Sequence, residues 1–110
     1  MAVTPTVIID PIVASNAQTT QYTSTGATTI IDKYTVRNYG GAGTTIGIYL
    51  VKTGTAASTT NLIVSRNIQI GETYTCPEVI GHVLEPGDFI STIAGAAESI
   101  AMRASGRVIT

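Results

Sequence analysis

The chain has very little of the residue types on which most reactive sites depend. It contains one cysteine, one histidine and no tryptophan, and only 12% of its 110 residues are charged. A lone cysteine excludes an internal disulfide and any cysteine-based zinc site, and it is consistent with folding in a reducing cytosol. The stability of the chain must therefore come from packing or from assembly.

Charge and hydropathy exclude two further classes of partner. The six Lys and Arg residues are scattered singly from Lys33 to Arg107, so the sequence has no basic stripe that could follow a nucleic-acid backbone. No apolar run approaches the roughly 18 residues that cross a bilayer, and the opening residues MAVTPTVIIDPIV lack the basic segment of a signal peptide. We expect a soluble, unprocessed chain that binds neither nucleic acid nor membrane.

The composition that remains is apolar and weakly charged. Hydrophobic residues make up 44% of the chain, the net charge is −1, and the length fits one domain. A small isolated domain normally carries about twice this share of charged residues, which keeps it soluble. The composition therefore favours a surface that is covered by other protein.

Periodicity predicts an all-β fold. No stretch shows a sustained helical period, whereas apolar and polar residues alternate in short segments that end at turn residues. With the terminal segments these give about eight antiparallel strands, typical of a jelly-roll-like sandwich. The expected strands include 18–24, 30–37, 46–50, 62–70, 73–76, 88–94 and 100–104.

Three local features are predicted within these strands. The segment NYGGAG (38–43) is expected to close an antiparallel hairpin between strands 30–37 and 46–50, because its residues tolerate positive φ. Arg66 falls on the apolar parity of its strand, which predicts a bulge or an edge position. Gly106 is expected to kink the C-terminal segment.

The first seventeen residues (1–17) differ in kind from the sandwich domain (18–110). Pro5 and Pro11 favour extended backbone and separate two apolar clusters. One interpretation is a first sandwich strand with a frayed end; the other is an extended N-terminal arm that packs on a neighbouring copy by strand addition or exchange. In the second interpretation the interface residues are Val3, Val7, Ile8, Ile9, Ile12 and Val13.

The segment EVIGHVLEPGDFI (78–90) holds the only histidine and three carboxylates. A metal site built from one imidazole and carboxylates is uncommon, and jelly-roll enzymes of the cupin type use several histidines. A turn explains the residues better, because Pro86 pre-sets φ, Gly87 accepts a positive φ, and Asp88 can accept bonds from backbone N–H groups. We predict a turn at Pro86, Gly87 and Asp88, and no catalytic, cofactor or metal site.

The remaining candidate groups also have structural explanations. Cys76 lies beside Pro77 at an expected strand end, where a small buried thiol is the usual outcome. Phosphate-binding glycine loops and a nucleophile elbow are missing from the sequence. The tyrosines could stack on sugars, although strand tyrosines are more often half-buried packing residues. They stand at positions 22, 34, 39, 49 and 74.

The order of these segments resembles a known family. TTIIDKYTVRN (28–38), IGIYLV (46–51), NLIVSRNIQIGETYTCPEVIGHVLEPGDFIS (61–91) and MRASGRVIT (102–110) resemble a small β-sandwich domain found in virion proteins of tailed bacteriophages. In length and N-terminal segment the chain looks most like the capsid decoration, or cement, proteins that sit as jelly-roll dimers on phage heads.

This resemblance implies a structural protein without enzymatic activity or cofactor. Its expected partners are the major capsid protein and further copies of itself, as a homodimer or higher homo-oligomer. Its expected location is the outer surface of the capsid in the virion, after synthesis in the host cytoplasm. The alternative is a neck, tail or fibre protein that binds host glycans, with Tyr39 and Tyr49 as the residues to test.

Overall fold

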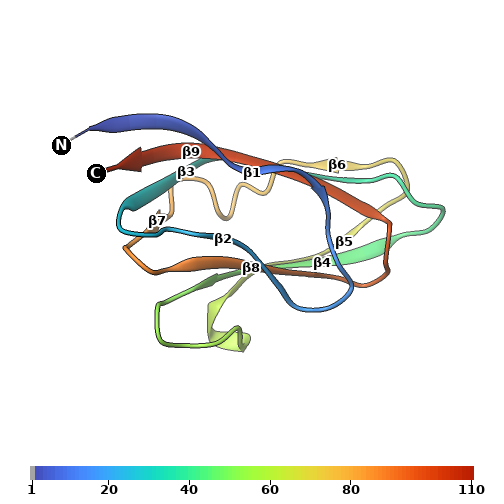
Figure 1. The fold of residues 1–110 in the computed structure, drawn as a ribbon. Coiled ribbons are helices and arrows are strands. Elements are labelled where there is room, and N and C mark those ends of the chain that lie inside the picture. The colour runs from blue at the N-terminus through green and yellow to red at the C-terminus, as the bar shows by residue number, and fades with distance from the viewer. Residues whose placement is uncertain (1) are drawn as a thin grey trace.

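Two antiparallel sheets pack face to face in the structure, a computed structural model that describes residues 2–110 (Figure 1). Sheet A contains β1 (Val3–Val13), β9 (Ile100–Ile109), β3 (Thr28–Asn38) and β6 (Thr73–Tyr74) in that order, with β7 (Val83–Leu84) also paired to β3. Sheet B contains β2 (Thr19–Thr23), β8 (Phe89–Ala94), β4 (Thr44–Val51) and β5 (Leu62–Ile68) in that order. A short 3-10 helix, η1 (Thr59–Asn61), precedes β5.

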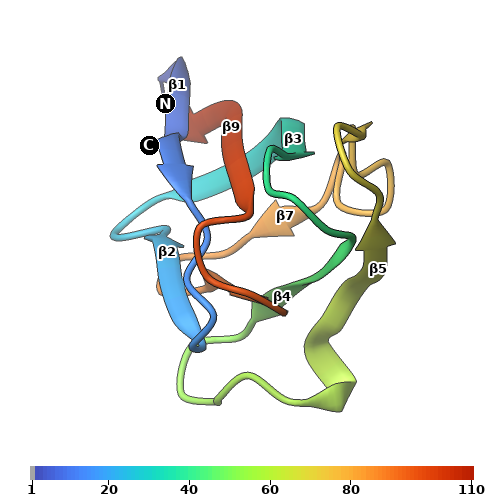
Figure 2. The same cartoon turned by 90° about the vertical axis from the view of Figure 1, so that its right-hand side faces the viewer.

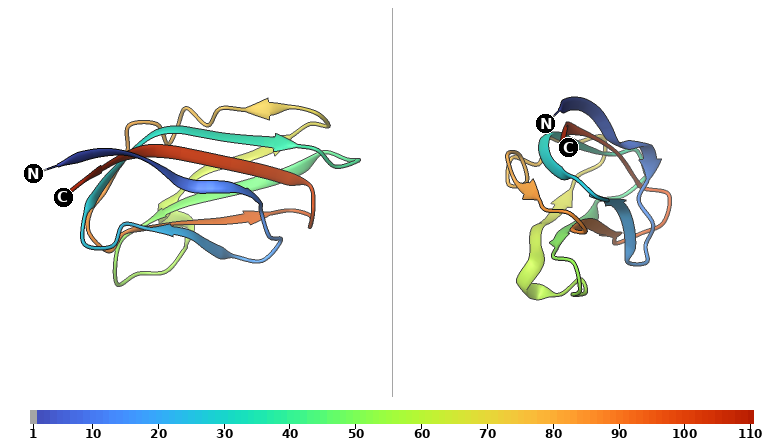
Figure 3. Two further views of the ribbon diagram at one scale, coloured as in Figure 1. Left: turned by 45° about the horizontal axis from the view of Figure 1, so that its top comes forward. Right: turned by 60° about the vertical axis from the view of Figure 1, so that its left-hand side comes forward.

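The strand order is that of a jelly roll. The chain passes from one sheet to the other at most connections, so that β1, β9, β3 and the β6/β7 edge face β2, β8, β4 and β5 (Figure 3). The predicted all-β, antiparallel sandwich is thereby confirmed. About eight strands were expected and nine are present in residues 2–110, because turns in residues 75–82 divide one edge strand into β6 and β7.

The core lies between the sheets and follows the alternation predicted for strand 30–37 from Tyr34 onward. Alternation placed Ile30 on the buried side as well, but the register shift between Ile31 and Lys33 buries Ile31 and leaves Ile30 on the outer face. On β3, Tyr34 and Val36 are fully buried while Lys33 and Arg37 on either side of them are exposed. On β4, the side chain of Ile48 is also completely covered. Burying a side chain of this size stabilises the fold by roughly 1.5–3 kcal/mol, so the inner faces of the two sheets hold the molecule together.

The N-terminal segment is a strand of the sandwich, so the interpretation as a separate arm is wrong. β1 pairs antiparallel with β9 from Val3 opposite Ile109 to Val13 opposite Ala101. A shift of register around Ile8 forms a bulge, and a bulge lets adjacent side chains leave simple alternation. Ile8 and the next residue therefore both enter the core, and the sandwich begins at β1 rather than at residue 18.

The predicted hairpin between strands 30–37 and 46–50 is also wrong. β3 belongs to sheet A and β4 to sheet B, so residues 39–43 form an arch that carries the chain between layers (Figure 2). The buried side chain of Asn38 organises this arch. Its Nδ2 donates to the carbonyls of Ala42 (2.7 Å) and Ile68 (2.9 Å), and its Oδ1 accepts a bond from the N–H of Gly40 (2.9 Å).

Gly106 does not kink the C-terminal strand. β9 continues to Ile109, and the irregularity lies instead in β3, between Ile31 and Lys33. A Cβ at Gly106 would collide with the carbonyl oxygen of Ile30, so glycine is needed here for close approach of two backbones. The edge position predicted from Arg66 is confirmed, since β5 is the last strand of sheet B.

The two described chain ends lie together at one end of an elongated molecule, 45 × 26 × 19 Å in extent (Figure 1). Ala2 and Thr110 exchange two backbone hydrogen bonds, of 2.9 and 3.0 Å. The β3–β4 arch lies at the opposite end (Figure 1). Within residues 2–110, no helix has the length and apolar character that crossing a bilayer requires.

Candidate interaction surface

Pro86, Gly87 and Asp88 form a turn, as predicted, within the segment that holds the histidine and three carboxylates. Gly87 has a φ of +91°, and the N–H of Asp88 donates to the carbonyl of Glu85 at 2.9 Å across Pro86. This geometry is that of a type II turn, in which the third residue needs a positive φ. The turn joins β7 in sheet A to β8 in sheet B.

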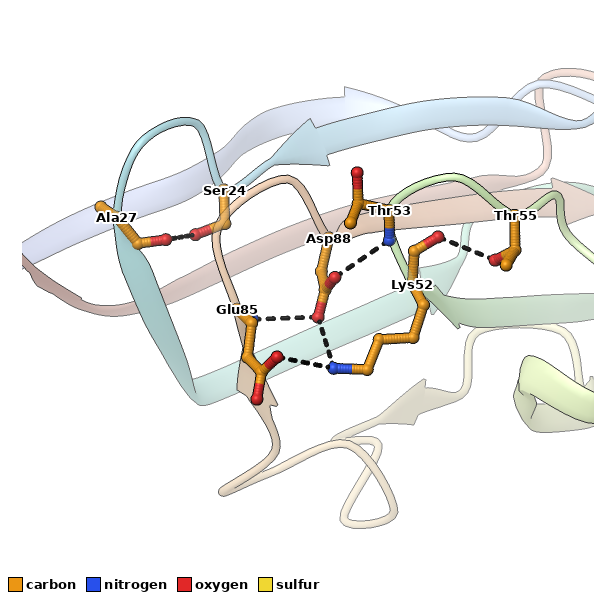
Figure 4. Close-up of polar contacts among 7 residues, drawn as sticks. All are labelled: Ser24, Ala27, Lys52, Thr53, Thr55, Glu85 and Asp88. Atoms are coloured by element: carbon orange, nitrogen blue, oxygen red, sulfur yellow. Dashed lines mark hydrogen bonds and ion pairs between the residues drawn. The ribbon is translucent and has the colours of Figure 1, made fainter.

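The carboxylate of Asp88 fastens this turn to the end of β4 (Figure 4). Its Oδ1 accepts a bond from the N–H of Thr53 (3.0 Å), and its Oδ2 accepts bonds from the N–H of Glu85 (3.0 Å) and from Nζ of Lys52 (3.3 Å). Burial alone would raise the pKa of Asp88, but these three donors outweigh it and lower the pKa below its ordinary value. Asp88 is therefore a structural anion within the physiological pH range.

The other polar groups of residues 78–90 have separate partners. Glu85 forms an ion pair with Lys52 (3.1 Å), and Glu78 accepts a hydrogen bond from the hydroxyl of Tyr74 (2.6 Å). His82 is exposed, and its backbone carbonyl accepts a bond from the N–H of Ile31. No group of three or more His, Cys, Asp or Glu side chains that could hold a metal occurs in residues 2–110.

Cys76 is a buried thiol, as its position beside proline predicts. Its side chain is fully covered, and burial raises its pKa to about 12, with a smaller contribution from the charge of Glu78. The thiolate needed for nucleophilic attack or metal binding is therefore scarce at neutral pH. Cys76 fills space between the sheets.

The outer face of sheet A carries exposed and half-exposed apolar side chains that lie in cross-strand rows. Val3 stands opposite Ile109 of β9, and Ile30 of β3 stands opposite Val83 of β7. An ion pair between Arg107 and Asp32 (2.9 Å) lies on the same face. Several exposed apolar side chains on one face are typical of a site of protein contact.

The six residues predicted as an interface divide into two groups. Ile8 and Ile9 are only 6% and 3% exposed and pack in the chain's own core, so they cannot contact a partner in this fold. The other four are 42–54% exposed, which leaves them free to do so: Val3, Val7, Ile12 and Val13. Sequence reasoning missed Ile30 and Val83, because their proximity depends on a pairing between strands that are distant in sequence.

β1 is an edge strand, and its prolines limit pairing with a further strand. Hydrogen-bonded and non-hydrogen-bonded residue pairs alternate along an antiparallel ladder, and Ala2 and Thr110 are a hydrogen-bonded pair. The backbone groups of Val3 and Pro5 therefore point away from β9, toward the free edge. Pro5 has no N–H to donate at that edge. Contact through the face of sheet A is therefore better supported than strand addition at β1.

The tyrosines proposed for sugar binding belong to different elements of the fold. Tyr49 lines a hollow of about 180 Å³ beside Gly47 on sheet B. Tyr39 lies in the arch that precedes β4, and its side chain is exposed. Tyr34 is buried in the core, where burial raises its pKa far above the ordinary value. Of these three rings only that of Tyr39 is exposed, whereas Tyr49 is half-buried.

Comparison with known proteins adds no relative. No protein-family model matches the chain, and no curated protein or solved structure matches it with statistical significance.

Proposed function

We propose that this chain is a structural protein of a tailed-phage virion that decorates the outer surface of the head and binds the major capsid protein. The observation that carries the proposal is the exposed apolar face of sheet A, around Val3, Val7, Ile30 and Val83. The jelly-roll order of the strands and the similarity of the segments described above support it.

Such a protein acts by binding an assembled lattice rather than by chemistry. A ligand that binds only the assembled state stabilises that state by mass action, so a protein that spans two capsid subunits opposes their separation. A homodimer with an isologous interface would present equivalent surfaces to both subunits. A stable contact of this kind buries on the order of 1,200–2,000 Å² in total.

The test changes the apolar face without touching the core. The double variant Val3→Asp/Val7→Asp should fold normally but lose saturable binding to purified phage heads that lack the protein, measured by co-sedimentation. Ile70→Asp is the control for an added surface carboxylate, because Ile70 is 63% exposed in the turn after β5, whose next residues bond to Asn38 at the arch. The control should bind heads as the unaltered chain does.

Two results would contradict the proposal. One is retention of full head binding by the double variant, and the other is failure of the unaltered chain to bind heads at any concentration. Sedimentation velocity on the free protein tests the homodimer separately, because a purely monomeric species would remove that part of the proposal.

A neck, tail or fibre protein that binds host glycans remains the second candidate. The observation that favours it is the hollow beside Gly47, where Tyr49 offers an aromatic face. Titration calorimetry with purified host surface polysaccharide should then show heat that disappears in Tyr49→Ala. Absence of heat with the unaltered chain would exclude this candidate for the polysaccharide tested.

A further inference from the structure

A groove of about 560 Å³ runs along the outer face of sheet A between β1 and β3. Its floor is low because Ala101 and Ser105 of β9 have small outward side chains. Ile12 and Val13 form one wall where the bulged part of β1 diverges from simple pairing. Long side chains of β3 form the other wall.

Three cations converge on this groove although they are scattered in the sequence. The strand register places Arg103 opposite Thr35, between the neighbouring rows that contain Lys33 and Arg37. All three side chains are exposed and line the groove. None of them forms an ion pair with any residue of 2–110.

The other three Lys and Arg residues are already engaged. Lys52 binds Glu85 and Asp88, Arg107 binds Asp32, and Arg66 lies 4.3 Å from the centre of the Tyr74 ring. Half of the chain's six basic residues are therefore unpaired and directed to one apolar groove. Lys33 and Arg37 share one face of β3, and the pairing of β3 with β9, which the linear sequence does not display, adds Arg103.

We propose that this groove binds an extended segment of a partner protein in which carboxylates alternate with apolar side chains. Ile12 and Val13 supply an apolar wall for the hydrophobic side chains, while Lys33, Arg37 and Arg103 lie within reach of the carboxylates. This binding mode does not require the partner to be a capsid subunit. If the proposed function also holds, the segment belongs to the shell.

A second copy of the chain fits this groove less well than an acidic segment does. An isologous dimer centred on the groove would set the same three cations against themselves, and like charges across an interface oppose association. Nucleic acid also fits less well, because the lining has no aromatic ring for base stacking and offers only three cations for phosphates.

The experiment uses a fluorescein-labelled peptide in which three glutamates alternate with leucine and valine. Fluorescence anisotropy should show saturable binding to the full chain, weakened when NaCl rises from 0.05 to 0.5 M. Lys33→Gln and Arg103→Gln should each lower the affinity several-fold, and the double variant should lower it about tenfold. Arg66→Gln makes the same change in net charge on sheet B and should leave the affinity unchanged.

Three outcomes would overturn the assignment. The first is equal binding of a peptide with lysines in place of the glutamates. The second is equal loss of affinity in Arg66→Gln and Arg103→Gln. The third is tighter, groove-dependent binding of single-stranded oligothymidylate, which would assign the groove to nucleic acid. Circular dichroism of each variant shows whether a loss of affinity comes from misfolding. The proposed function is tested separately, by comparing head binding of the unaltered chain with that of the Val3→Asp/Val7→Asp protein.

Discussion

At the scale of single residues, two positions determine how closely the backbone segments approach. Gly106 lets β9 pass against the backbone of β3 where that strand is irregular, and Asp88 ties the β7–β8 turn to the end of β4. Neither residue contributes much apolar area. A larger side chain at position 106 would push the strands apart, and a neutral one at position 88 would weaken the bonds that hold the turn.

Replacing Gly106 with alanine should destabilise the fold strongly. The added Cβ collides with the carbonyl oxygen of Ile30, so one strand must move, at a cost of about 3 kcal/mol in the free energy of unfolding. Gly41→Ala is the control, because a Cβ there has no neighbour within 4 Å. Urea denaturation of both variants gives the comparison; equal stability of the two would contradict the predicted contact.

Replacing Asp88 with asparagine should cost about 2 kcal/mol at neutral pH, because the amide cannot accept all the bonds that the carboxylate accepts. The folded-state pKa of Asp88 lies below that of the unfolded chain, so its contribution is complete above the unfolded value near 4 and is lost as the pH falls through the folded pKa.

The acid sensitivity of the unfolding midpoint should therefore be smaller in Asp88→Asn than in the unaltered chain when pH 7 and pH 3 are compared. Glu85→Gln serves as the control, since its side chain is 68% exposed and its loss should change stability by no more than about 0.5 kcal/mol. If the unfolding midpoint falls equally between pH 7 and pH 3 in the unaltered chain, Asp88→Asn and Glu85→Gln, other groups control the acid response.

Residues whose role is local were predictable, and those whose role depends on distant strands were not. Pro86, Gly87 and Asp88 were placed correctly because a tight turn is determined by neighbours in sequence. The burial of Ile8 and Ile9 was not, because it depends on a bulge opposite β9. The groove cations were missed for the same reason: alternation places Lys33 and Arg37 on one face of β3, but only the register with β9 adds Arg103.

At the scale of elements, the β3–β4 arch shows how one buried side chain can fasten a connection between two sheets. Asn38 is fully buried and bonds to the arch at Gly40 and Ala42 and to β5 at Ile68. A tight hairpin would need positive φ in the connection, yet none of the glycines of the arch has it. Glycine at position 40 instead permits close approach to Ser99.

Asn38→Ala should therefore destabilise the fold by roughly 2–4 kcal/mol, because it leaves the carbonyls of Ala42 and Ile68 and the N–H of Gly40 without their partner. Asn67→Ala, at an exposed position on the neighbouring β5, should change stability by no more than about 0.5 kcal/mol. Thermal unfolding followed by circular dichroism measures both. If Asn38→Ala is as stable as the unaltered chain, the arch does not depend on this side chain.

The strand boundaries were largely predictable from alternation, while the partner of each strand was not. Turn chemistry at 38–43 is compatible with a hairpin or with an arch, and the bonds of the buried Asn38 amide are made in the arch. The sequence contains that asparagine but gives no indication that it is buried. Strand partners depend on which apolar faces meet, a property of the complete sandwich.

At the scale of the whole molecule, the jelly roll makes the N-terminal segment part of the core. Ile8→Ala and Ile9→Ala should each cost about 2–4 kcal/mol, whereas Val7→Ala should be nearly neutral because Val7 is 44% exposed. Removal of residues 2–13 should prevent folding, because it uncovers one side of β9. A folded, cooperative truncated chain, detected by its amide NMR dispersion, would restore the interpretation as a dispensable arm.

The pairing of Ala2 with Thr110 also determines the mechanical behaviour of the molecule. Tension between the two chain ends acts across β1 and β9, so it should open their ladder one rung at a time, as a zipper opens. Tension between residue 2 and the distant arch at residue 41 would instead act along the strands and load many rungs together (Figure 1). Optical tweezers should record a lower unfolding force for the first attachment than for the second; the reverse order would exclude this behaviour.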